Sequence, residues 1–449
     1  MQKTKLSRLL AILAVLALTA ASCGSGEDET SNDTSAPEGT EAGTDSTEAE
    51  EEEEEETNNN NTLDTSLTQY REISLDAEGG EAAPTCSGES NDELEFGGLL
   101  PETGNLAFLG PPEFAGVELA VQEINEAGGV LGNDVKWSPG DSGDNGTVAN
   151  QTVDRHLEDG VDVVVGAASS GVSFTVLEKI SDACKVMFSP ANTSPDFTTK
   201  DPGEMYFRTA PSDVGQGQVL ADLIIEDGAS TAAIMALQDP YGEGLLKFTK
   251  EPLEAAGVTV VTDFTYDPKA ASFDSEVEKV TGDDPDAIVV IGFDESAEIL
   301  SGLFEKGIGT DQIYLVDGNV GNALGEKFEP GQLTGIRGTF PTAEITEDFE
   351  SDMLGIDSEL IDFTYGPESY DAVIISALAA IAADSDSPSE IAKNINGITR
   401  DGTECTSFAD CKKILEDGGE VAYTGPSGPS EFSQPGERTK GSMAIVEYG

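Results

Sequence analysis

Short apolar runs alternate with amphipathic segments along most of the chain. The runs are rich in valine and isoleucine and have the length of buried strands, and the segments between them repeat apolar residues at helical spacing. This alternation is typical of mainly parallel sheets that are covered on both faces by helices. In the first series we predict strands over 94–100, 135–138, 163–165 and 186–188, and helices over 114–126, 148–157 and 174–184.

A second series of the same kind begins after Asp213. We predict strands over 232–237, 258–263, 287–292 and 312–316, and helices over 215–226, 245–256, 274–281 and 296–306. Two series of similar length indicate an α/β protein with two similar lobes. The chain then returns through a helix over 367–383 and closing strands over 421–423 and 442–448, which predicts a hinge of several strands. We expect 86–212 plus about 341–425 in lobe 1, and 213–340 plus about 426–449 in lobe 2.

Polar turns follow two neighbouring strands of the first series. Strand 163–165 is followed by Gly166-Ala-Ala-Ser-Ser-Gly171, and strand 186–188 by Ser189-Pro-Ala-Asn-Thr193. Both turns place small hydroxyl side chains at the carboxyl ends of parallel strands, where open α/β sheets bind ligands. The pattern predicts a site for a small polar molecule. The alternative is that Ser169 or Ser170 only caps the helix that follows.

The first 23 residues have the composition of a secretory signal. A basic start precedes an apolar stretch over 9–18 and a small-residue region that ends at Cys23. This arrangement resembles a bacterial lipoprotein signal with Cys23 as the lipidated residue, and the alternative is an ordinary signal peptide with an incidental cysteine. The later apolar stretch 373–383 is too short to span a bilayer and suits a buried helix. We therefore expect an exported, water-soluble protein that is at most tethered.

Residues 24–85 are expected to form a disordered acidic stalk. Residues 24–60 contain fifteen Asp and Glu residues and no Lys or Arg, so the segment repels itself and has nothing to bury. The whole chain of 449 residues carries a formal net charge of −64 at pH 7. A field of this sign excludes nucleic acid and anionic lipid surfaces as partners. Screening in a high-salt environment is one explanation for such a charge.

Four cysteines follow Cys23, and an even number in an exported protein favours disulfide bonds. Cys405 and Cys411 are close in sequence, so we predict a local bridge between them, which leaves Cys86 to pair with Cys184. The second bridge would tie the start of the folded region to lobe 1. Zinc is the competing interpretation. The chain has one histidine and no Cys-x-x-Cys pair, so we predict no metal site.

The first polar turn also resembles the nucleophile elbow of α/β-hydrolases, with alanine in place of the first glycine. That family places its catalytic histidine after the serine and the acid. The single histidine, His156, precedes the turn, on a helix that we expect to be exposed. A Ser-His-Asp triad cannot be assembled in that order, and we predict neither an enzyme nor a bound cofactor.

Further motifs follow one another at characteristic spacing over 92–449. They are Gly98-Leu-Leu-Pro-Glu-Thr-Gly104, Ile124-Asn-Glu-Ala-Gly-Gly-Val-Leu-Gly132, the two polar turns, Phe207-Arg-Thr209, Asp239-Pro-Tyr-Gly-Glu-Gly244 and Tyr370-Asp-Ala372. In this order they resemble the extracytoplasmic solute-binding proteins of branched-chain amino-acid ABC importers. Members of that family have the type I periplasmic-binding fold, with two α/β lobes joined by a hinge. The resemblance implies that fold here.

The resemblance also implies that an amino-acid ligand lies between the lobes and is held mainly by lobe 1. Ser170 matches a hydroxyl partner of the ligand's carboxylate or amine. Ala191 offers backbone groups, and Thr193 offers its hydroxyl and its amide. Ala168 matches a small wall position, and Leu109 matches a position where relatives often carry a large aromatic residue.

Lobe 2 is expected to close over this ligand. Tyr241 matches a ring that covers the ligand, and Asp317 lies one residue from the family's acidic partner for the ammonium group. Asp213 is expected at the hinge rather than in direct contact with the ligand.

The function implied by the resemblance is that of a substrate-binding lipoprotein. It would be anchored by Cys23 at the outer face of the bacterial cytoplasmic membrane and would deliver an amino acid or a similar small solute to the permease subunits of an ABC importer. It is expected to act as a monomer. The alternative is a ligand-sensing module of a signalling system.

Overall fold

Two separate sheets carry the fold, as the alternation of apolar runs predicts. The computed structural model describes residues 61–75, 82–200, 204–433 and 436–449, which belong to one unit of the chain. The predicted signal peptide 1–23, with the predicted lipidation site Cys23, and the acidic segment 24–60 lie outside the described residues. The first sheet is entirely parallel, in the order β3-β2-β4-β5-β6. Its strands are β2 (Glu95–Leu99), β3 (Lys136–Ser138), β4 (Val163–Gly166), β5 (Val186–Ser189) and β6 (Tyr206–Arg208).

The second sheet has seven strands in the order β1-β16-β11-β10-β9-β7-β8. Its strands are β1 (Gln69–Ser74), β7 (Thr231–Leu237), β8 (Thr259–Tyr266), β9 (Ala287–Ile291), β10 (Ile313–Val316), β11 (Arg337–Pro341) and β16 (Lys440–Glu447). Strands β7 to β11 are parallel to one another, whereas β16 runs antiparallel to both β11 and β1. We call the first sheet with its helices lobe 1 and the second with its helices lobe 2. Both predicted series of strands are confirmed.

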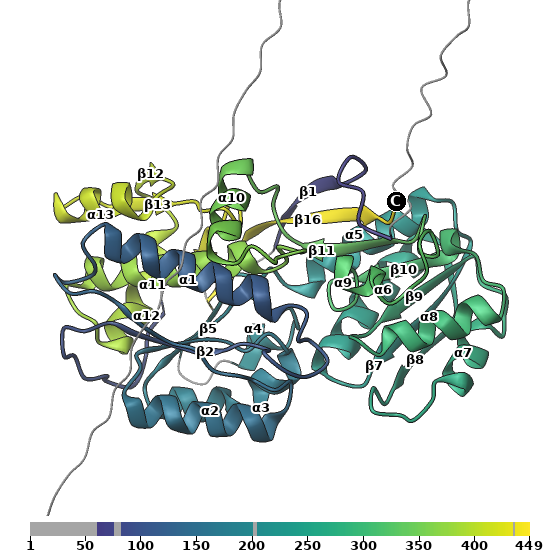
Figure 1. The fold of residues 1–449 in the computed structure, drawn as a ribbon, viewed down its shortest axis with the longest axis horizontal. Helices are drawn as coiled ribbons and strands as arrows, with labels where there is room; N and C mark the ends of the chain where they lie inside the picture. The colour runs from purple at the N-terminus through teal and green to yellow at the C-terminus, as the bar shows by residue number, and fades with distance from the viewer. Residues whose placement is uncertain (1–60, 76–81, 201–203, 434–435) are drawn as a thin grey trace, which may run out of the picture. The chain divides into compact units, whose positions relative to one another are not determined.

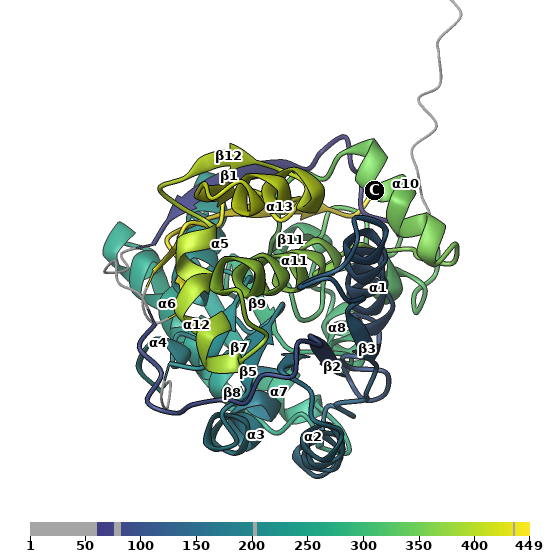
Figure 2. The same ribbon diagram turned by 90° about the vertical axis from the view of Figure 1, so that its left-hand side faces the viewer.

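Helices cover both faces of the lobe 1 sheet. Helices α2 and α3 lie on one face, and α1, α11 and α12 lie on the other (Figures 1 and 2). The helices of lobe 1 are α1 (Gly110–Glu126), α2 (Gly146–Asp159), α3 (Ser170–Asp182), α4 (Phe197–Lys200), α10 (Glu347–Ile356), α11 (Gly366–Ala383), α12 (Pro388–Ile398) and α13 (Phe408–Glu416). Those of lobe 2 are α5 (Asp213–Glu226), α6 (Pro240–Ala256), α7 (Asp274–Thr281), α8 (Ser296–Glu305), the 3-10 turn η1 (Thr310–Gln312) and α9 (Asn322–Gly325). In lobe 2, α5 packs against α6 and α7 packs against α8.

Helix α6 illustrates how local sequence sets the ends of these helices. The Asp239 side chain accepts a hydrogen bond of 2.8 Å from the backbone N–H of Gly242, and Pro240 occupies the first turn. At the other end Gly257 takes a left-handed conformation with φ of 94°, which favours glycine. The cap and the proline start the helix five residues earlier than its apolar periodicity predicts.

The apolar stretch of α11 lies inside lobe 1. Its residues from Gly366 to Ala380 are all buried, because α1 and α12 pack on it and it covers the sheet. A helix that is apolar on all sides needs such surroundings. The prediction of a buried helix here is confirmed. Among the residues that the structure describes, no helix combines the length and the apolar composition needed to cross a lipid bilayer.

After residue 82, three segments of the described chain pass from one lobe to the other. The first crossing, 209–212, joins β6 to α5, and the second, 342–346, joins β11 to α10. The third crossing is Thr439, between β15 (Glu437–Arg438) and β16. These crossings form the predicted hinge of several strands.

The expected boundary between the lobes at about 426 is wrong. Phe432 belongs to the apolar cluster of lobe 1, and the carbonyl of Gly436 accepts a hydrogen bond from the N–H of Arg208. Residues up to 438 therefore belong to lobe 1, where β14 (Phe432–Ser433) pairs with β15. The predicted strand 421–423 is β13 (Val421–Tyr423), which pairs with β12 (Thr403–Cys405) in a small sheet of its own. The sequence does not indicate which lobe such short strands join.

The expected stalk 24–85 is also too long, because residues 61–75 are part of lobe 2. Strand β1 pairs with β16 over six residues, from Gln69 opposite Ile445 to Ser74 opposite Lys440. Asn61 is buried, and its amide donates to the carbonyls of Gly325, Phe328 and Glu329. The acidic composition of the neighbouring residues masked this short strand.

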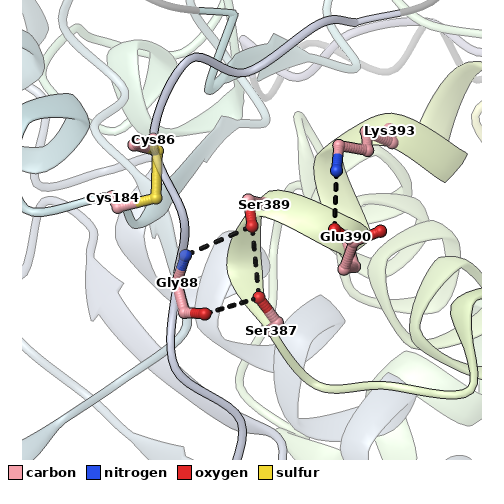
Figure 3. The surroundings of a disulfide bond; sticks show 7 residues. All are labelled: Cys86, Gly88, Cys184, Ser387, Ser389, Glu390 and Lys393. Atoms are coloured by element: carbon pink, nitrogen blue, oxygen red, sulfur yellow. Dashed lines mark hydrogen bonds and ion pairs between the residues drawn. A yellow bond between two sulfur atoms is a disulfide. The ribbon is translucent and has the colours of Figure 1, made fainter.

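Both predicted disulfide bonds are present. Cys86 pairs with Cys184, and Cys405 pairs with Cys411. The first bridge closes a loop of 98 residues and fastens the segment before β2 to the end of α3 (Figure 3). The second is local, between β12 and α13.

Candidate ligand-binding site

A small cavity lies between the two lobes. It is lined by all seven residues expected at the ligand site, namely Leu109, Ala168, Ser170, Ala191, Thr193, Tyr241 and Asp317. The remaining lining residues, which the sequence did not lead us to assign, are Leu106, Ser169, Phe293, Gly318 and Tyr365. The volume of about 20 Å³ holds roughly one water molecule. Any larger ligand therefore requires the walls to move apart.

The turn after β4 uses its two serines differently. Ser169 is the N-cap of α3, and its side chain accepts a hydrogen bond of 3.3 Å from the N–H of Val172. Ser170 is the first residue of the helix, and its Oγ accepts a hydrogen bond of 3.3 Å from the N–H of Ser194. The capping alternative thus applies to Ser169, and the hydroxyl proton of Ser170 remains available as a donor.

The turn after β5 is locked onto the first turn. Ser189 Oγ donates to the carbonyl of Ala167 over 2.7 Å, and the amide of Asn192 donates to the carbonyls of Ala167 and Ala168 over 2.9 and 2.8 Å. These bonds hold Ala191 and Thr193 against the cavity with 6% and 1% exposure. The lobe 1 wall is therefore positioned by contacts within lobe 1.

The lobe 2 wall contains a carboxylate with three hydrogen-bond donors. Asp317 follows β10, and its Oδ1 accepts from Tyr241 Oη over 2.7 Å and from Gln216 Nε2 over 3.0 Å. Its Oδ2 accepts from Tyr365 Oη over 2.7 Å. Tyr365 is the N-cap of α11, a lobe 1 helix, so its bond to Asp317 connects the lobes.

Burial dominates the electrostatics of this wall. Burial raises the pKa of Asp317, although the hydroxyls of Tyr241 and Tyr365 lower it. Burial and then the Asp317 carboxylate raise the pKa of both tyrosines well above its usual value, so the rings stay neutral and donate. Burial, followed by Asp317, also raises the pKa of Asp213 well above its usual range, while the Thr193 hydroxyl lowers it. A cation bound here would relieve the mutual repulsion of Asp213 and Asp317.

Apolar side chains complete the cavity. The rings of Tyr241 and Phe293 stack with their centroids 5.6 Å apart and their planes at 16°, and Leu106 and Leu109 face the same cavity. Phe293 follows β9, so it lies at the carboxyl end of a parallel strand, the signal that identified the two polar turns of lobe 1. The same reasoning could have found Phe293. Tyr365 has no such signal, because it precedes a helix and comes from the opposite lobe.

Carboxyl groups of both lobes approach one another beside the cavity. We call Asp144 of lobe 1 and Asp239 and Glu295 of lobe 2 the acidic rim. The pKa of Asp144 and that of Asp239 are raised to about 6, mainly by burial and to a smaller extent by the charge of another rim residue. Burial likewise raises the pKa of Glu295. The rim therefore places like charges together where the lobes meet.

His156 is buried rather than exposed, which corrects the expectation from its charged neighbours. Its Nε2 lies 2.7 Å from the carbonyl oxygen of Gly98 beneath the lobe 1 sheet, and burial lowers its pKa. A neutral ring in this position packs the α2 helix against β2. Within the described ranges no group of three or more His, Cys, Asp or Glu residues is arranged to hold a metal ion.

Comparison with known proteins identifies the family. The model of the family described as "Periplasmic binding protein" matches residues 93–449. The chain belongs to this family. Family membership and the type I periplasmic-binding fold, both expected from the motifs, are thereby confirmed. The description of this family is that of a binding protein.

Curated relatives include binding proteins for branched-chain amino acids. "Leu/Ile/Val-binding protein homolog 3" of Brucella melitensis is 28% identical over 210 residues, which are 46% of this chain and 57% of the relative. "Leu/Ile/Val-binding protein BraC3" of Rhizobium johnstonii is 27% identical over 210 residues, which are again 46% of this chain and 57% of the relative. The match thus spans little more than half the length of these two relatives. "Chemotactic signal transduction system substrate-binding protein BasB" of Halobacterium salinarum is 24% identical over 369 residues, 78% of this chain and 86% of the relative.

Solved structures share the fold at low sequence identity. The branched-chain amino-acid transporter substrate-binding protein LivJ from Streptococcus pneumoniae, in complex with isoleucine, has a TM-score of 0.66 and 23% identity, over 80% of this chain and all of that one. A solute-binding protein from R. palustris in complex with 4-hydroxybenzoate has a TM-score of 0.60 and 15% identity, over 71% of this chain and 87% of that one. Isoleucine has an amine, whereas 4-hydroxybenzoate has none.

Proposed function

We propose that this protein is the substrate-binding component of an ABC importer and captures an amino acid between its lobes. The observation that carries the proposal is the pairing of neutral hydroxyls on lobe 1 with a buried carboxylate, Asp317, on lobe 2. An α-amino acid has the complementary pair of groups, a carboxylate and an ammonium. Buried charges of this kind need a partner, and a ligand ammonium is a suitable one.

The donors and acceptors of the cavity assign each end of the ligand. The Ser170 hydroxyl accepts from the N–H of Ser194 and donates its own proton to the ligand carboxylate, with Thr193 beside it. Asp317 Oδ1 already accepts two hydrogen bonds and Oδ2 accepts one. A carboxylate oxygen accommodates about two donors, so Oδ2 takes the ammonium N–H. The rings of Tyr241 and Phe293 then cover the side chain.

Binding is coupled to movement of the lobes. A cavity of about 20 Å³ is far smaller than an amino acid, so the lobes separate to admit it and close around it. The contacts from Asp317 and Tyr241 are complete only in the closed form, and the ligand shifts the population toward that form. The closed form is the one that the permease subunits recognise. The protein acts as a monomer outside the cell, held at the outer face of the membrane by a lipid on Cys23.

A thermal-shift screen of the purified protein tests the proposal. The panel contains leucine, isoleucine, valine, other amino acids, small amides, urea and short peptides, together with benzoate as an acid that lacks an amine. Ligand that binds the folded state raises the melting temperature by mass action. We expect amino acids to raise it and benzoate to leave it unchanged. Recognition of the ammonium group would be contradicted if benzoate raised the melting temperature, or if none of the amino acids did.

A sensing role is the second candidate. It is favoured by the relative from Halobacterium salinarum, which is named for a chemotactic signal transduction system and is covered over 86% of its length. The two roles differ in the membrane partner of the loaded protein. Crosslinking in the native membrane separates them, since an importer crosslinks to a permease and a sensor to a transducer.

A further inference from the structure

The two lobes touch directly beside the cavity, where α3 of lobe 1 meets α6 of lobe 2. The backbone of Gly171, in the first turn of α3, is so close to the N-cap of α6 that a Cβ on this glycine would lie 3.1 Å from Asp239 Oδ2. The residues that follow Thr193 on lobe 1 also face the start of α6. We call this contact the seam. It joins the lobes in addition to the bond between Tyr365 and Asp317.

Ser194 makes a hydrogen bond across the seam. This serine is buried, and its Oγ donates to the carbonyl of Pro240, in the first turn of α6, over 2.9 Å. Its backbone N–H donates to Ser170 Oγ over 3.3 Å. Pro240 is followed by Tyr241, which lines the cavity as Ser170 does. One residue thus contacts a candidate ligand-binding hydroxyl of lobe 1 and the backbone next to a candidate ligand-binding ring of lobe 2.

The other contacts of Ser194 lie within lobe 1. Its carbonyl accepts from Arg208 Nη1 over 2.8 Å, and Arg208 is itself buried and forms an ion pair with Glu437. The Oγ of Ser194 also accepts from the N–H of Asp196 over 3.4 Å. These bonds do not depend on the position of lobe 2. The bond to Pro240 crosses to the other lobe and therefore requires the lobes to be together.

Gly244 allows the lobes to approach this closely. It lies in the second turn of α6, and a Cβ at this position would be 2.7 Å from Cδ of Pro195, the residue after Ser194. Outside its own helix, the three nearest atoms all belong to Pro195, so lobe 1 alone limits the space here. Glycine in a helix is less favourable than alanine. The close approach of the other lobe accounts for a glycine at this place.

We propose that Ser194 is a positioning residue that couples ligand binding to closure of the lobes. Its N–H holds the Ser170 oxygen, which leaves the hydroxyl proton of Ser170 free to point at the ligand. Its own hydroxyl holds the start of α6, and with it Tyr241, against lobe 1 once the lobes meet. Because the bond to Pro240 breaks when the lobes part, it slows release of the ligand. This role of Ser194 rests on the proposed function, and it assigns part of the affinity to a contact that lies beside the ligand.

Removal of the Ser194 hydroxyl tests this role. Ser194→Ala deletes the bond across the seam but keeps the N–H that holds Ser170. We expect the affinity for leucine to fall by about threefold to tenfold in stopped-flow titration, through faster dissociation with unchanged association. The matched control is Ser376→Ala, which deletes a buried hydroxyl that donates to the carbonyl of Ala372 within α11 over 2.7 Å, and it should leave both rates unchanged. A loss of stability without faster dissociation in Ser194→Ala would show that this serine only stabilises its own turn.

Obstruction of the seam from lobe 2 provides an independent test. Gly244→Ala adds a Cβ that collides with Pro195 only when the lobes are closed. We expect about a tenfold loss of affinity for leucine, because overpacked contacts are costly. The melting temperature of the ligand-free protein should not fall, since alanine favours the helix. Gly355→Ala, in α10, is the control, because a Cβ there has no atom within 4 Å. Unchanged affinity in Gly244→Ala would overturn the seam as part of the closed form.

Hydrogen exchange in the ligand-free protein separates a failure of this role from a failure of the proposed function. The backbone N–H of Ser194 is covered by lobe 2 at the seam, so it should exchange when the lobes separate. We expect about threefold to tenfold faster exchange at this N–H in Gly244→Ala than in the unsubstituted protein. Equal exchange in the two proteins would overturn the coupling. Faster exchange in a protein that binds neither leucine nor any other amino acid would contradict the proposed function alone.

Discussion

The two walls of the cavity are built in different ways. The lobe 1 wall consists of uncharged groups, and Ser189 and Asn192 hold its two turns together through bonds within lobe 1. The lobe 2 wall contains the buried charge of Asp317 and aromatic rings, and Tyr365 completes it from the start of a lobe 1 helix. The first wall is therefore formed in either position of the lobes, while the second reaches its full set of contacts only when they are together. Binding that favours closure has to draw on the second wall.

Among the residues of the two walls, substitution of the charged residue Asp317 should have the largest effect on ligand affinity. Asp317→Asn keeps the shape of the wall but removes the charge that faces the ligand ammonium. A hydrogen bond to a charged group contributes about 1.5–3 kcal/mol, so we expect the affinity for leucine to fall by about 100-fold in calorimetric titration. The control is Asp294→Asn, an exposed acid of the same lobe, which should leave affinity unchanged. Equal affinity for leucine in Asp317→Asn would remove this residue from the site.

Substitution on the uncharged wall should have a smaller effect. Ser170→Ala removes one donor to the ligand carboxylate, and we expect about a tenfold loss of affinity with little change in the melting temperature. Ser169→Ala removes the N-cap of α3 instead and should lower the free energy of unfolding by about 1 kcal/mol with a smaller effect on affinity. Titration and thermal denaturation of both variants separate the two roles. Equal losses of affinity in the two variants would contradict the assignment of ligand binding to Ser170 and helix capping to Ser169.

Loss of the contact that joins the walls should have a still smaller effect on affinity, and this effect should depend on pH. Tyr365→Phe removes one of the three side-chain donors that favour the ionised form of Asp317, so the pKa of Asp317 rises further. A neutral hydrogen bond contributes about 0.5–1.5 kcal/mol, and we expect a loss of affinity of about threefold to tenfold at neutral pH. The loss should grow as the pH falls, because more Asp317 is protonated. Tyr70→Phe, far from the cavity, is the control, and the same loss at every pH would contradict this account.

Substitution in the acidic rim should have the smallest effect, and we expect it in the stability of the protein rather than in ligand affinity. The pKa of Asp144 is raised to about 6 from an ordinary value near 4. The folded state therefore binds more protons than the unfolded state between these values, so this group lowers stability as the pH rises through that window. Asp144→Asn should remove that slope and raise the melting temperature at pH 8 by about 1–2 °C at low salt, and less at high salt. Asp283→Asn serves as an exposed control, and a lower melting temperature in Asp144→Asn would contradict repulsion at the rim.

Local signals in the sequence predicted most of the fold. Both ends of α7 were predicted correctly, since it starts after a polar loop and stops before a glycine turn. Helices α1 and α6 begin earlier than predicted, because prolines in the first turn of each helix, together with the Asp239 cap in α6, extend them past their apolar periodicity. The seven candidate site residues lie around one cavity, since most of them follow strands whose carboxyl ends converge. Whether they bind a ligand stays a prediction, which the substitutions above test.

The alternation of apolar and polar residues by itself determined the two mainly parallel sheets, the helices that cover them and the polar turns at their ends. The number and spacing of cysteines favoured the two disulfide bonds that the structure contains. Only the tertiary structure decided that β1 joins lobe 2, that His156 is buried under β2, and that Tyr365 reaches Asp317 from the other lobe. Periodicity specifies which face of an element is buried, but it carries no information about which distant segment covers that face. Those pairings depend on contacts between residues far apart in the chain, and they exist only once both lobes are in place.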